Sequence, residues 1–282
     1  MRDPLIGKQL DSYRIDAVLG GGGSTRVFRA RDLKRKVDVA LKVIDPALDQ
    51  SIDQAGYVRS LMDQAAAIQA LKHPNLVPLR DYHWSGGLFY FVMDLVEGKP
   101  LSDILDIHRH EGTRLTPAEM AGPISELAGA LDYIHGQGLI HRNVKPANVM
   151  MLKDGHTMLL DFGLVLRAVQ ATTGNPFRNV HYTAPEQSVS SEKAVPQSDE
   201  YALAVIVYEL MTGRVPFDEK TPMGITLKHL SAPPPPPRQF NPDLSKKAEK
   251  VVLKALAKKP EERYSSAGAF AKALAAAGSG RR

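Results

Sequence analysis

Three polar side chains near the middle of the chain have the types and spacing of a site that holds a cation and a phosphate. Lys145 and Asn148 lie three residues apart, and Asp161 follows Asn148 by thirteen residues. The residues between them predict two short apolar strands around an Asp-Gly turn. Such a hairpin would bring Asn148 and Asp161 to one end, where amide and carboxylate oxygens suit Mg²⁺ and the lysine suits phosphate. The alternative is a surface loop whose polar residues are unrelated.

The composition limits the class of protein. A chain of 282 residues with 43% hydrophobic and 24% charged residues can bury a large core, as one domain or two lobes. The net charge of +5 is modest, and Lys and Arg are scattered, so solvated faces are expected and no nucleic-acid partner. The absence of cysteine excludes disulfides, thiolate metal sites and cysteine nucleophiles.

The chain shows no signal for secretion or membrane insertion. Arg2, Asp3 and Pro4 precede any apolar run, which argues against a signal peptide. The longest apolar run, Ala202 to Tyr208, is far shorter than the roughly 20 residues that span a bilayer. We therefore expect a soluble, cytoplasmic segment without membrane contact.

Two stretches upstream would position a phosphate-bearing ligand. An alternating pattern from Tyr13 to Leu19 predicts a strand, and four glycines follow it from Gly20 to Gly23. Bare N–H groups in such a loop can hold phosphate oxygens, although a flexible hairpin would have the same composition. The next predicted strand has Val and Leu on one face and Ala40 and Lys42 on the other.

Helical patterns precede both halves of the site. Apolar residues recur at three- and four-residue steps between Ser51 and Leu71. A second helix should begin after Thr116, which is followed by Pro117 and by Glu119 at the capping-box position. It should end near Gly136 and deliver the chain to His141.

The segment H-R-N-V-K-P-A-N at 141–148, followed by D-F-G at 161–163, resembles the catalytic loop and metal-binding segment of eukaryotic-like (Hanks-type) serine/threonine protein kinases. The glycine loop and the V-A-L-K sequence at 39–42 are similar to other motifs of that family. The resemblance covers about Ser12 to Ala277. It implies an α+β, two-lobed fold, with a small β-rich N-lobe that has one long helix (12–94), a hinge (95–98), a mainly helical C-lobe (99–277) and a tail (278–282).

The resemblance also implies roles for individual residues. The implied nucleotide-binding residues are Gly20, Gly22, Val27, Ala40, Lys42, Met93, Asp94, Val96 and Met150. Asn148 and Asp161 would hold Mg²⁺, and Lys145 would act in the catalytic loop. Asp199 would brace the backbone of that loop, and Arg263 would form a buried pair with Glu186.

Besides Thr25, which replaces the third glycine of the loop, three positions depart from the family pattern. The catalytic-loop Asp is replaced by Asn143, the helix Glu that would pair with Lys42 by Gln64, and the Thr before the A-P-E sequence by Asn179. Asp63, next to Gln64, is the alternative partner of Lys42, although its shorter side chain would point about 100° away around the helix. Asn143 can accept a hydrogen bond but cannot take up a proton, and general-base assistance is worth about 10²–10⁴ in rate. Thr172 and Thr173 are possible phosphorylation sites, although two threonines in a polar loop are also common.

These observations predict a pseudokinase that binds ATP with Mg²⁺, transfers phosphate weakly or not at all, and works by presenting a surface to a protein partner. The alternative is an active serine/threonine kinase captured as an inactivating Asp-to-Asn variant at position 143. A third possibility is a scaffold that does not depend on nucleotide.

Overall fold

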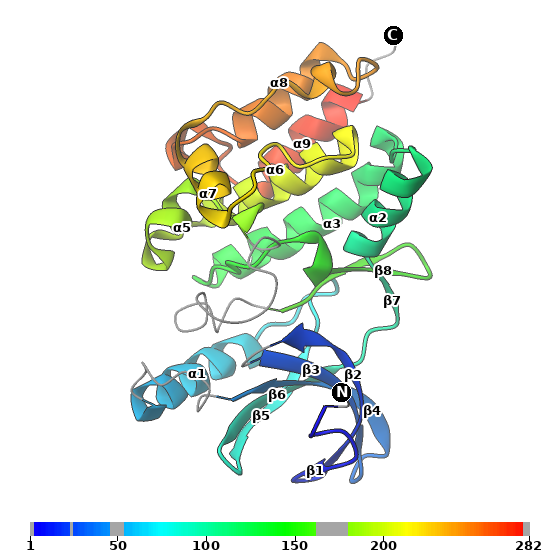
Figure 1. Ribbon diagram of the computed structural model, residues 1–282, viewed down its shortest axis with the longest axis vertical. Coiled ribbons are helices and arrows are strands. Elements are labelled where there is room, and N and C mark those ends of the chain that lie inside the picture. The colour runs from blue at the N-terminus through cyan, green and yellow to red at the C-terminus, as the bar shows by residue number, and fades with distance from the viewer. Residues whose placement is uncertain (1–2, 23–24, 46–53, 162–179, 279–282) are drawn as a thin grey trace. The chain divides into compact units, whose positions relative to one another are not determined.

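The computed structural model describes residues 3–22, 25–45, 54–161 and 180–278 (Figure 1). The contacts among them divide the described chain into two compact units. Unit 1 contains residues 3–72 and 77–97, and unit 2 contains residues 73–76, 98–161 and 180–278, apart from the gaps above.

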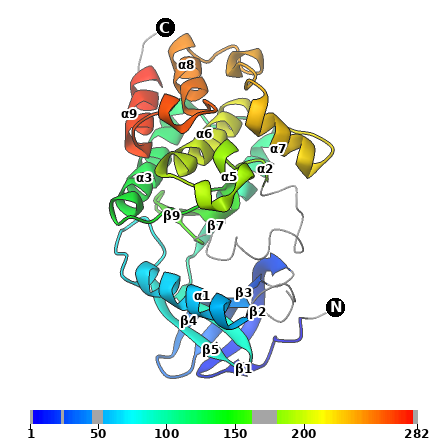
Figure 2. The ribbon, with the colours of Figure 1, turned by 90° about the vertical axis from the view of Figure 1, so that its left-hand side faces the viewer.

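Unit 1 contains a six-stranded antiparallel sheet with strand order β1-β2-β3-β4-β6-β5. Its strands are β1 (Gln9–Leu10), β2 (Tyr13–Gly22), β3 (Thr25–Asp32), β4 (Val37–Ile44), β5 (Leu79–Ser85) and β6 (Leu88–Asp94). Helix α1 (Gln54–Gln69) packs against β5, as Figure 2 shows. The predicted strands and the predicted helix of this region are confirmed.

One face of this sheet carries the core of unit 1. Alternate residues of β2, β3, β4 and β6 pack together there: Tyr13, Ile15, Phe28, Ala30, Val39, Leu41, Val43, Tyr90 and Val92. Because side chains alternate across a strand, Ala40 and Lys42 lie on the other face of β4, as the sequence predicted. The segment before β1 adds Leu5 to the core, which places residues 3–10 in the sheet's packing.

Unit 2 is mainly helical and has one small sheet of strand order β7-β8-β9. Its strands are β7 (Gly98–Pro100), β8 (Val149–Leu152) and β9 (Thr157–Leu159). Its α-helices are α2 (Leu101–Glu111), α3 (Pro117–Gly136), α5 (Pro185–Val189), α6 (Pro196–Thr212), α7 (Pro222–Ser231), α8 (Lys246–Ala255) and α9 (Ala267–Gly278). Short 3₁₀ turns are η2 (Pro146–Asn148), η3 (Ser191–Lys193), η4 (Pro237–Gln239) and η5 (Pro260–Glu262).

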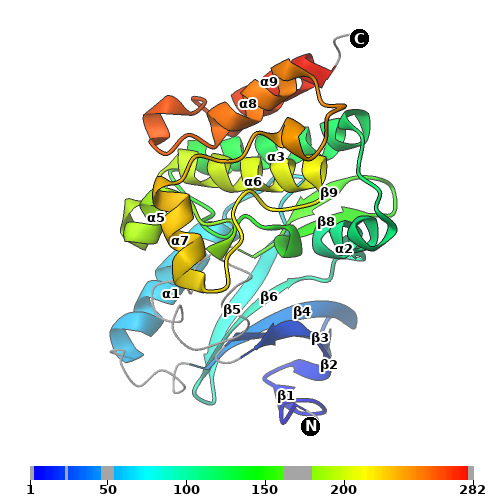
Figure 3. The same cartoon turned by 45° about the horizontal axis from the view of Figure 1, so that its top comes forward.

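Helix α6 is the central element of unit 2, because every residue from Ser198 to Thr212 is buried. It packs against α3, α8 and α9, and α9 also packs against α3 and α8, as Figure 3 shows. Helix α6 begins at Pro196, since proline fits the first helical turn. It ends at Thr212, where Gly213 takes a left-handed φ of 77°.

Helix α3 begins as the sequence predicts. The backbone nitrogen of Glu119 donates to Thr116 Oγ1 at 3.3 Å, and Glu119 Oε2 accepts from the Thr116 nitrogen at 2.7 Å. This reciprocal capping box satisfies two donors that the helix start leaves free. In the described part of the chain, no helix has both the length and the apolar character needed to cross a membrane.

Candidate active site

The backbone of the 141–148 loop is held from α6 by the carboxylate of Asp199. Asp199 Oδ2 accepts from the His141 nitrogen and Oδ1 from the Arg142 nitrogen, both at 2.8 Å. Asp199 is 1% exposed, and Arg142 has a left-handed φ of 65° that these bonds maintain. His135 Nε2, at the end of α3, also contacts Asp199 Oδ2 at 2.8 Å. The predicted brace by Asp199 is confirmed.

The buried imidazole of His141 connects the loop to the end of the β8–β9 hairpin. Its Nε2 donates to the Leu160 carbonyl oxygen at 3.0 Å, and its Nδ1 accepts from the Asn143 nitrogen at 3.3 Å. Since Nδ1 accepts a hydrogen bond from an N–H group, the ring is neutral and carries its proton on Nε2. The imidazole therefore sets the distance between the two segments that carry Asn143 and Asp161.

Asn143, Asn148 and Asp161 lie together at the end of the hairpin. The Leu160 nitrogen donates to the Asn148 carbonyl oxygen at 2.7 Å, which brings the two strand ends side by side as predicted. Asn148 Nδ2 donates to the Asn143 carbonyl oxygen at 2.8 Å. Asn143 Nδ2 donates to Asp161 Oδ2 at 3.4 Å and to the Asp161 carbonyl oxygen at 3.5 Å.

The oxygen chemistry of this group fits a hard cation. The amide nitrogen of Asn148 donates to the Asn143 carbonyl oxygen, so Oδ1 of Asn148 is the atom that could bind a cation, together with the Asp161 carboxylate. Within the described ranges, no cluster of three or more His, Cys, Asp or Glu residues is placed to hold a metal. A magnesium ion bound here would take its remaining ligands from water and phosphate. Lys145, at the N-terminal end of η2, lies on the same loop.

In unit 1 the predicted nucleotide residues form rows across the sheet. Gly20 pairs with Val27, and Val27 pairs with Lys42, so these three lie side by side on β2, β3 and β4. Ala40, two residues before Lys42 on β4, pairs with Met93 of β6. Directly paired residues point to the same side of a sheet, so Val27, Ala40, Lys42 and Met93 share one face.

The glycine whose conformation the backbone requires is Gly21. It has a φ of +93°, and a Cβ added to it would lie 2.5 Å from the Thr25 carbonyl oxygen. Around Gly20, by contrast, nothing lies within 4 Å of an added Cβ. The sequence singled out Gly20 and Gly22, both of which lie in β2, and did not identify Gly21.

The remaining predicted residues are placed as follows. The amide nitrogen of Gln64 in α1 donates to Ser60 Oγ at 2.8 Å, and its pairing with Lys42 stays a prediction. Asp94 ends β6, and its backbone nitrogen donates to the Pro78 carbonyl oxygen at 3.3 Å. Val96 follows in the connector, and Met150 lies in β8. Phe162, Gly163, Thr172, Thr173 and Asn179 lie outside the described residues.

A second polar cluster in unit 2 was not predicted. Tyr182 donates its hydroxyl to Glu209 Oε2 at 2.6 Å, and Arg109 Nη2 donates to Glu209 Oε1 at 2.9 Å. Arg109 Nη1 also contacts Asp106 Oδ1 at 2.6 Å. Burial raises the pKa of Glu209, and the hydrogen bond from Tyr182 and the charge of Arg109 oppose that rise.

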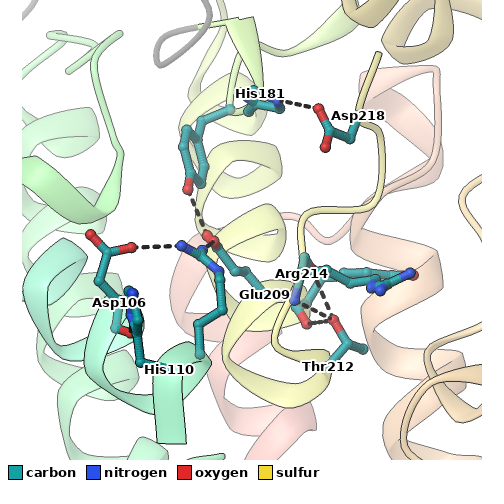
Figure 4. Close-up of polar contacts among 10 residues, drawn as sticks. Asp106, His110, His181, Glu209, Thr212, Arg214 and Asp218 are labelled. Carbon is teal, nitrogen blue, oxygen red and sulfur yellow. Dashed lines mark hydrogen bonds and ion pairs between the residues drawn. The ribbon is translucent and has the colours of Figure 1, made fainter. Parts of the chain in front are cut away.

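This cluster lines a cavity of about 730 Å³ that Lys145 also borders. Figure 4 shows His181 and Asp218 turned toward each other at this cavity, where His181 Nε2 lies 3.2 Å from Asp218 Oδ1. The partners come from positions up to 100 residues apart, such as Arg109 and Glu209. No local pattern could therefore have joined them, although a glutamate inside an otherwise apolar helix was a signal that it has a buried partner.

The buried ion pair of Glu186 and Arg263 is present as predicted. Arg263 Nη1 and Nη2 donate to Glu186 Oε1 and Oε2, both at 2.8 Å, and the arginine side chain is 0% exposed. Ser198 Oγ donates to Glu186 Oε1 at 2.6 Å. Hydrogen bonds from Arg263 and Ser198 lower the pKa of Glu186 against the opposing effect of its burial. The pair ties the start of α5 to the residue that follows η5.

Comparison with known proteins agrees with this geometry. The model of the protein kinase domain family matches residues 13–275. The chain is 33% identical over 267 residues to serine/threonine-protein kinase PrkC of Bacillus subtilis, covering 93% of this chain and 40% of the relative. It is 36% identical over 268 residues to serine/threonine-protein kinase PknB of Mycolicibacterium smegmatis, covering 91% of this chain and 41% of the relative.

A solved structure is similar over nearly the whole chain. The crystal structure of the Mycobacterium tuberculosis PknI kinase domain superposes with a TM-score of 0.75 at 29% identity and covers 95% of this chain and 97% of that one. The predicted fold, a β-rich lobe and a mainly helical lobe, is confirmed. The chain spans about 40% of the length of the curated relatives it matches. With bacterial serine/threonine kinases as relatives and the kinase motifs in place, the chain belongs to the protein kinase domain family, in its bacterial Hanks-type branch.

Proposed function

We propose that this chain is a protein-kinase-like domain that binds ATP with Mg²⁺ but transfers phosphate weakly or not at all. It would act as a pseudokinase, a nucleotide-sensitive module that binds a protein partner. Location in the cytoplasm, where ATP is supplied, is part of the same proposal.

The observation that carries this proposal is the direction of the Asn143 amide. A general base must present an acceptor with a free lone pair to the substrate hydroxyl and then hold its proton. Asn143 turns its N–H group to Asp161 Oδ2 at 3.4 Å, and an amide oxygen does not take up a proton at neutral pH. Positioning and charge neutralisation would remain, so a low rate is expected in place of complete loss.

The residues for nucleotide binding support the other half of the proposal. Lys42 would pair with the phosphates, and the N–H groups of the glycine hairpin would hold phosphate oxygens. Ala40, Val27, Met93 and Met150 would enclose the base, with the backbone at Asp94 and Val96 as its hydrogen-bond partner. Asn148 and Asp161 would hold the magnesium ion, whose charge offsets that of the phosphates when it is bound.

The names of the relatives favour a second candidate. PrkC and PknB are serine/threonine-protein kinases, so an active enzyme with one inactivating change at position 143 would also fit. The two candidates differ in what restoring the acid would do. Asn143→Asp would give a kinase with a high rate of phosphotransfer if the residue at position 143 is the sole cause of the low rate.

The decisive experiment combines nucleotide binding with phosphotransfer. We expect Mg-ATP to raise the melting temperature of the unchanged protein, and Asn143→Asp to remain weak in a radiolabelled transfer assay with a generic substrate. Mass spectrometry after incubation with ATP would also report on Thr172 and Thr173. The double variant Asn143→Asp with Asp161→Asn is the control, because it lacks the carboxylate at the metal position.

Two outcomes would contradict the proposal. No stabilisation by Mg-ATP would remove the nucleotide function and leave a scaffold. Rapid transfer by Asn143→Asp that disappears in the double variant would establish the kinase with a single inactivating change.

A further inference from the structure

The segment before the first long strand is fastened to the sheet of unit 1 at both ends. At one end Asp11 accepts hydrogen bonds from Ser85 Oγ, at 3.0 Å, and from the hydroxyl of Tyr90. At the other end the Asp3 carboxylate contacts Arg26 Nη1 at 3.0 and 3.1 Å. Between them the Gly7 nitrogen donates to the Ile15 carbonyl oxygen at 2.8 Å. Residues 3–11 thus run as an ordered strap from β5 and β6 to the start of β3.

The Asp3 carboxylate is fixed in place before it meets its partner. Asp3 Oδ1 accepts from the Leu5 nitrogen at 2.9 Å, and the backbone carbonyl oxygen of Asp3 accepts from the Ile6 nitrogen at 3.1 Å. Leu5 in turn packs against the core of the sheet. An acceptor held in this way loses little side-chain entropy when it binds a cation, which makes the ion pair stronger than an unrestrained surface pair.

Arg26 depends on this partner because it is poorly hydrated. Its side chain is 19% exposed and that of Asp3 is 15% exposed. Its Nε is buried and has no hydrogen-bond partner among the described residues, and its guanidinium lies 5.7 Å from the centre of the buried Phe28 ring. Loss of the Asp3 charge would leave a half-buried cation without compensation, which favours movement of Arg26 toward water.

Movement of Arg26 would reach the glycine hairpin directly. Arg26 is paired with Gly21 across β2 and β3, with Gly22 opposite Thr25 on the next rung. The backbones are so close there that a Cβ on Gly21 would lie 2.8 Å from Arg26 Cα. The position of Gly21, and of the N–H groups beside it, therefore follows the position of Arg26.

We propose that Asp3 and Arg26 are positioning residues for phosphate binding. Their ion pair holds the start of β3 against Gly21 and Gly22 of β2, and so raises the affinity for nucleotides that carry phosphates. This inference rests on the proposed nucleotide function. Backbone N–H groups of residues 20–22 and 25–27 that are already held in place do not have to be ordered on binding, so their phosphate contacts contribute more to affinity.

The test compares a nucleotide with its nucleoside by calorimetry. Asp3→Asn and Arg26→Gln should weaken Mg-ADP binding by about threefold to tenfold, the range of one partly buried ion pair. Adenosine has no phosphate to meet the hairpin, so its affinity should change by less than about twofold. Arg26→Lys keeps the charge and should recover most of the ADP affinity. Arg14→Gln removes the exposed Arg14–Asp16 pair of β2 and is the matched control.

Hydrogen exchange of residues 20–27 in the nucleotide-free protein gives an independent readout. We expect faster exchange in Asp3→Asn and Arg26→Gln than in Arg14→Gln. Equal weakening of ADP and adenosine would show a general loss of structure and overturn the proposal, as would unchanged ADP affinity. If the unchanged protein binds no ADP, both the proposed nucleotide function and the proposed effect on affinity are contradicted. Exchange would then decide separately whether Asp3 holds the hairpin.

Discussion

Asp199 holds Arg142 in a left-handed backbone conformation through a 2.8 Å hydrogen bond to the Arg142 nitrogen. The same carboxylate accepts a hydrogen bond from the His141 nitrogen, so one buried side chain of α6 sets the path of the 141–148 loop. An amide at this position could not accept from both N–H groups with both of its atoms, because its nitrogen is itself a donor.

Asp199→Asn should therefore destabilise unit 2 strongly. We expect a loss of about 3 kcal/mol in the free energy of unfolding, since a buried charge-assisted bond is lost and a donor faces a donor. Urea denaturation measures the change. Asp103→Asn, at an exposed residue in the first turn of α2, is the control and should cost less than about 0.5 kcal/mol. Equal effects of the two variants would contradict the proposed brace.

The Glu186–Arg263 pair should be sensitive to the loss of either partner. Glu186→Gln leaves the fully buried Arg263 without a counter-charge, and breaking such a pair costs about 3–5 kcal/mol. Arg263→Lys should also be costly, because a lysine cannot make the two parallel contacts. A double-mutant cycle with Glu186→Gln and Arg263→Met would show strong coupling. Additive single effects would mean that the pair contributes little beyond packing.

Ionisation of Glu200 should lower stability as the pH rises toward about 8. Burial raises its pKa to about 8, from 4.5 for an ordinary glutamate. Between these values the folded chain binds one more proton than the unfolded chain, so the free energy of unfolding falls as pH rises from about 4.5 to about 8. The slope from one proton is at most about 1.4 kcal/mol per pH unit. Glu200→Gln should remove this slope in denaturation measured at pH 6.5 and 8, and an unchanged slope would refute the assignment.

Below neutral pH, His229 should act in the opposite direction. Burial lowers its pKa to about 3, from 6.5, while its Nδ1 lies 2.8 Å from the Tyr201 hydroxyl. The unfolded chain binds the extra proton between these values, so stability is lost as pH falls from about 6.5 to about 3. From about 4.5 to 6.5 the two slopes oppose each other. His229→Asn should flatten the acid limb below pH 4.5 and leave the alkaline limb in place.

Two adjacent glycines of the hairpin should differ in their tolerance of alanine. Gly21→Ala requires a positive φ from an L-residue and places Cβ 2.5 Å from the Thr25 carbonyl oxygen, so we expect a loss of at least about 1–2 kcal/mol and weaker ADP binding. Gly20→Ala meets nothing within 4 Å and should cost less than about 1 kcal/mol. Thermal unfolding of both variants decides the matter, and comparable losses would contradict the structure.

Features encoded locally could be predicted from the sequence. Alternation placed Ala40 and Lys42 on the face opposite the core, and the Thr116 capping box marked the start of α3. Helix α7 begins with a similar cap: Thr221 precedes Pro222 and accepts from the Gly224 nitrogen at 3.1 Å. Its glycine and proline content hid it, because both residues usually argue against a helix.

Contacts between distant residues could not be predicted where no family motif marks both partners. Asp3 and Arg26 are 23 positions apart, and Tyr182 and Glu209 are 27 apart, so only the folded chain brings them together. The chemistry of the 141–161 region was visible in its residue types. The direction of the Asn143 amide was not, because it is set by the Asp161 oxygens that lie next to it.

From Ser198 to Thr212 helix α6 has no solvent-facing side, since all of these residues are buried. Its amide hydrogens can therefore exchange with solvent only when the whole of unit 2 opens. Exchange at α6 thus measures the global stability of that unit without added denaturant. The exchange rate of α6 is also an internal reference for the 141–148 loop, which is held from the same helix: faster exchange in the loop would show that it opens without global unfolding of unit 2.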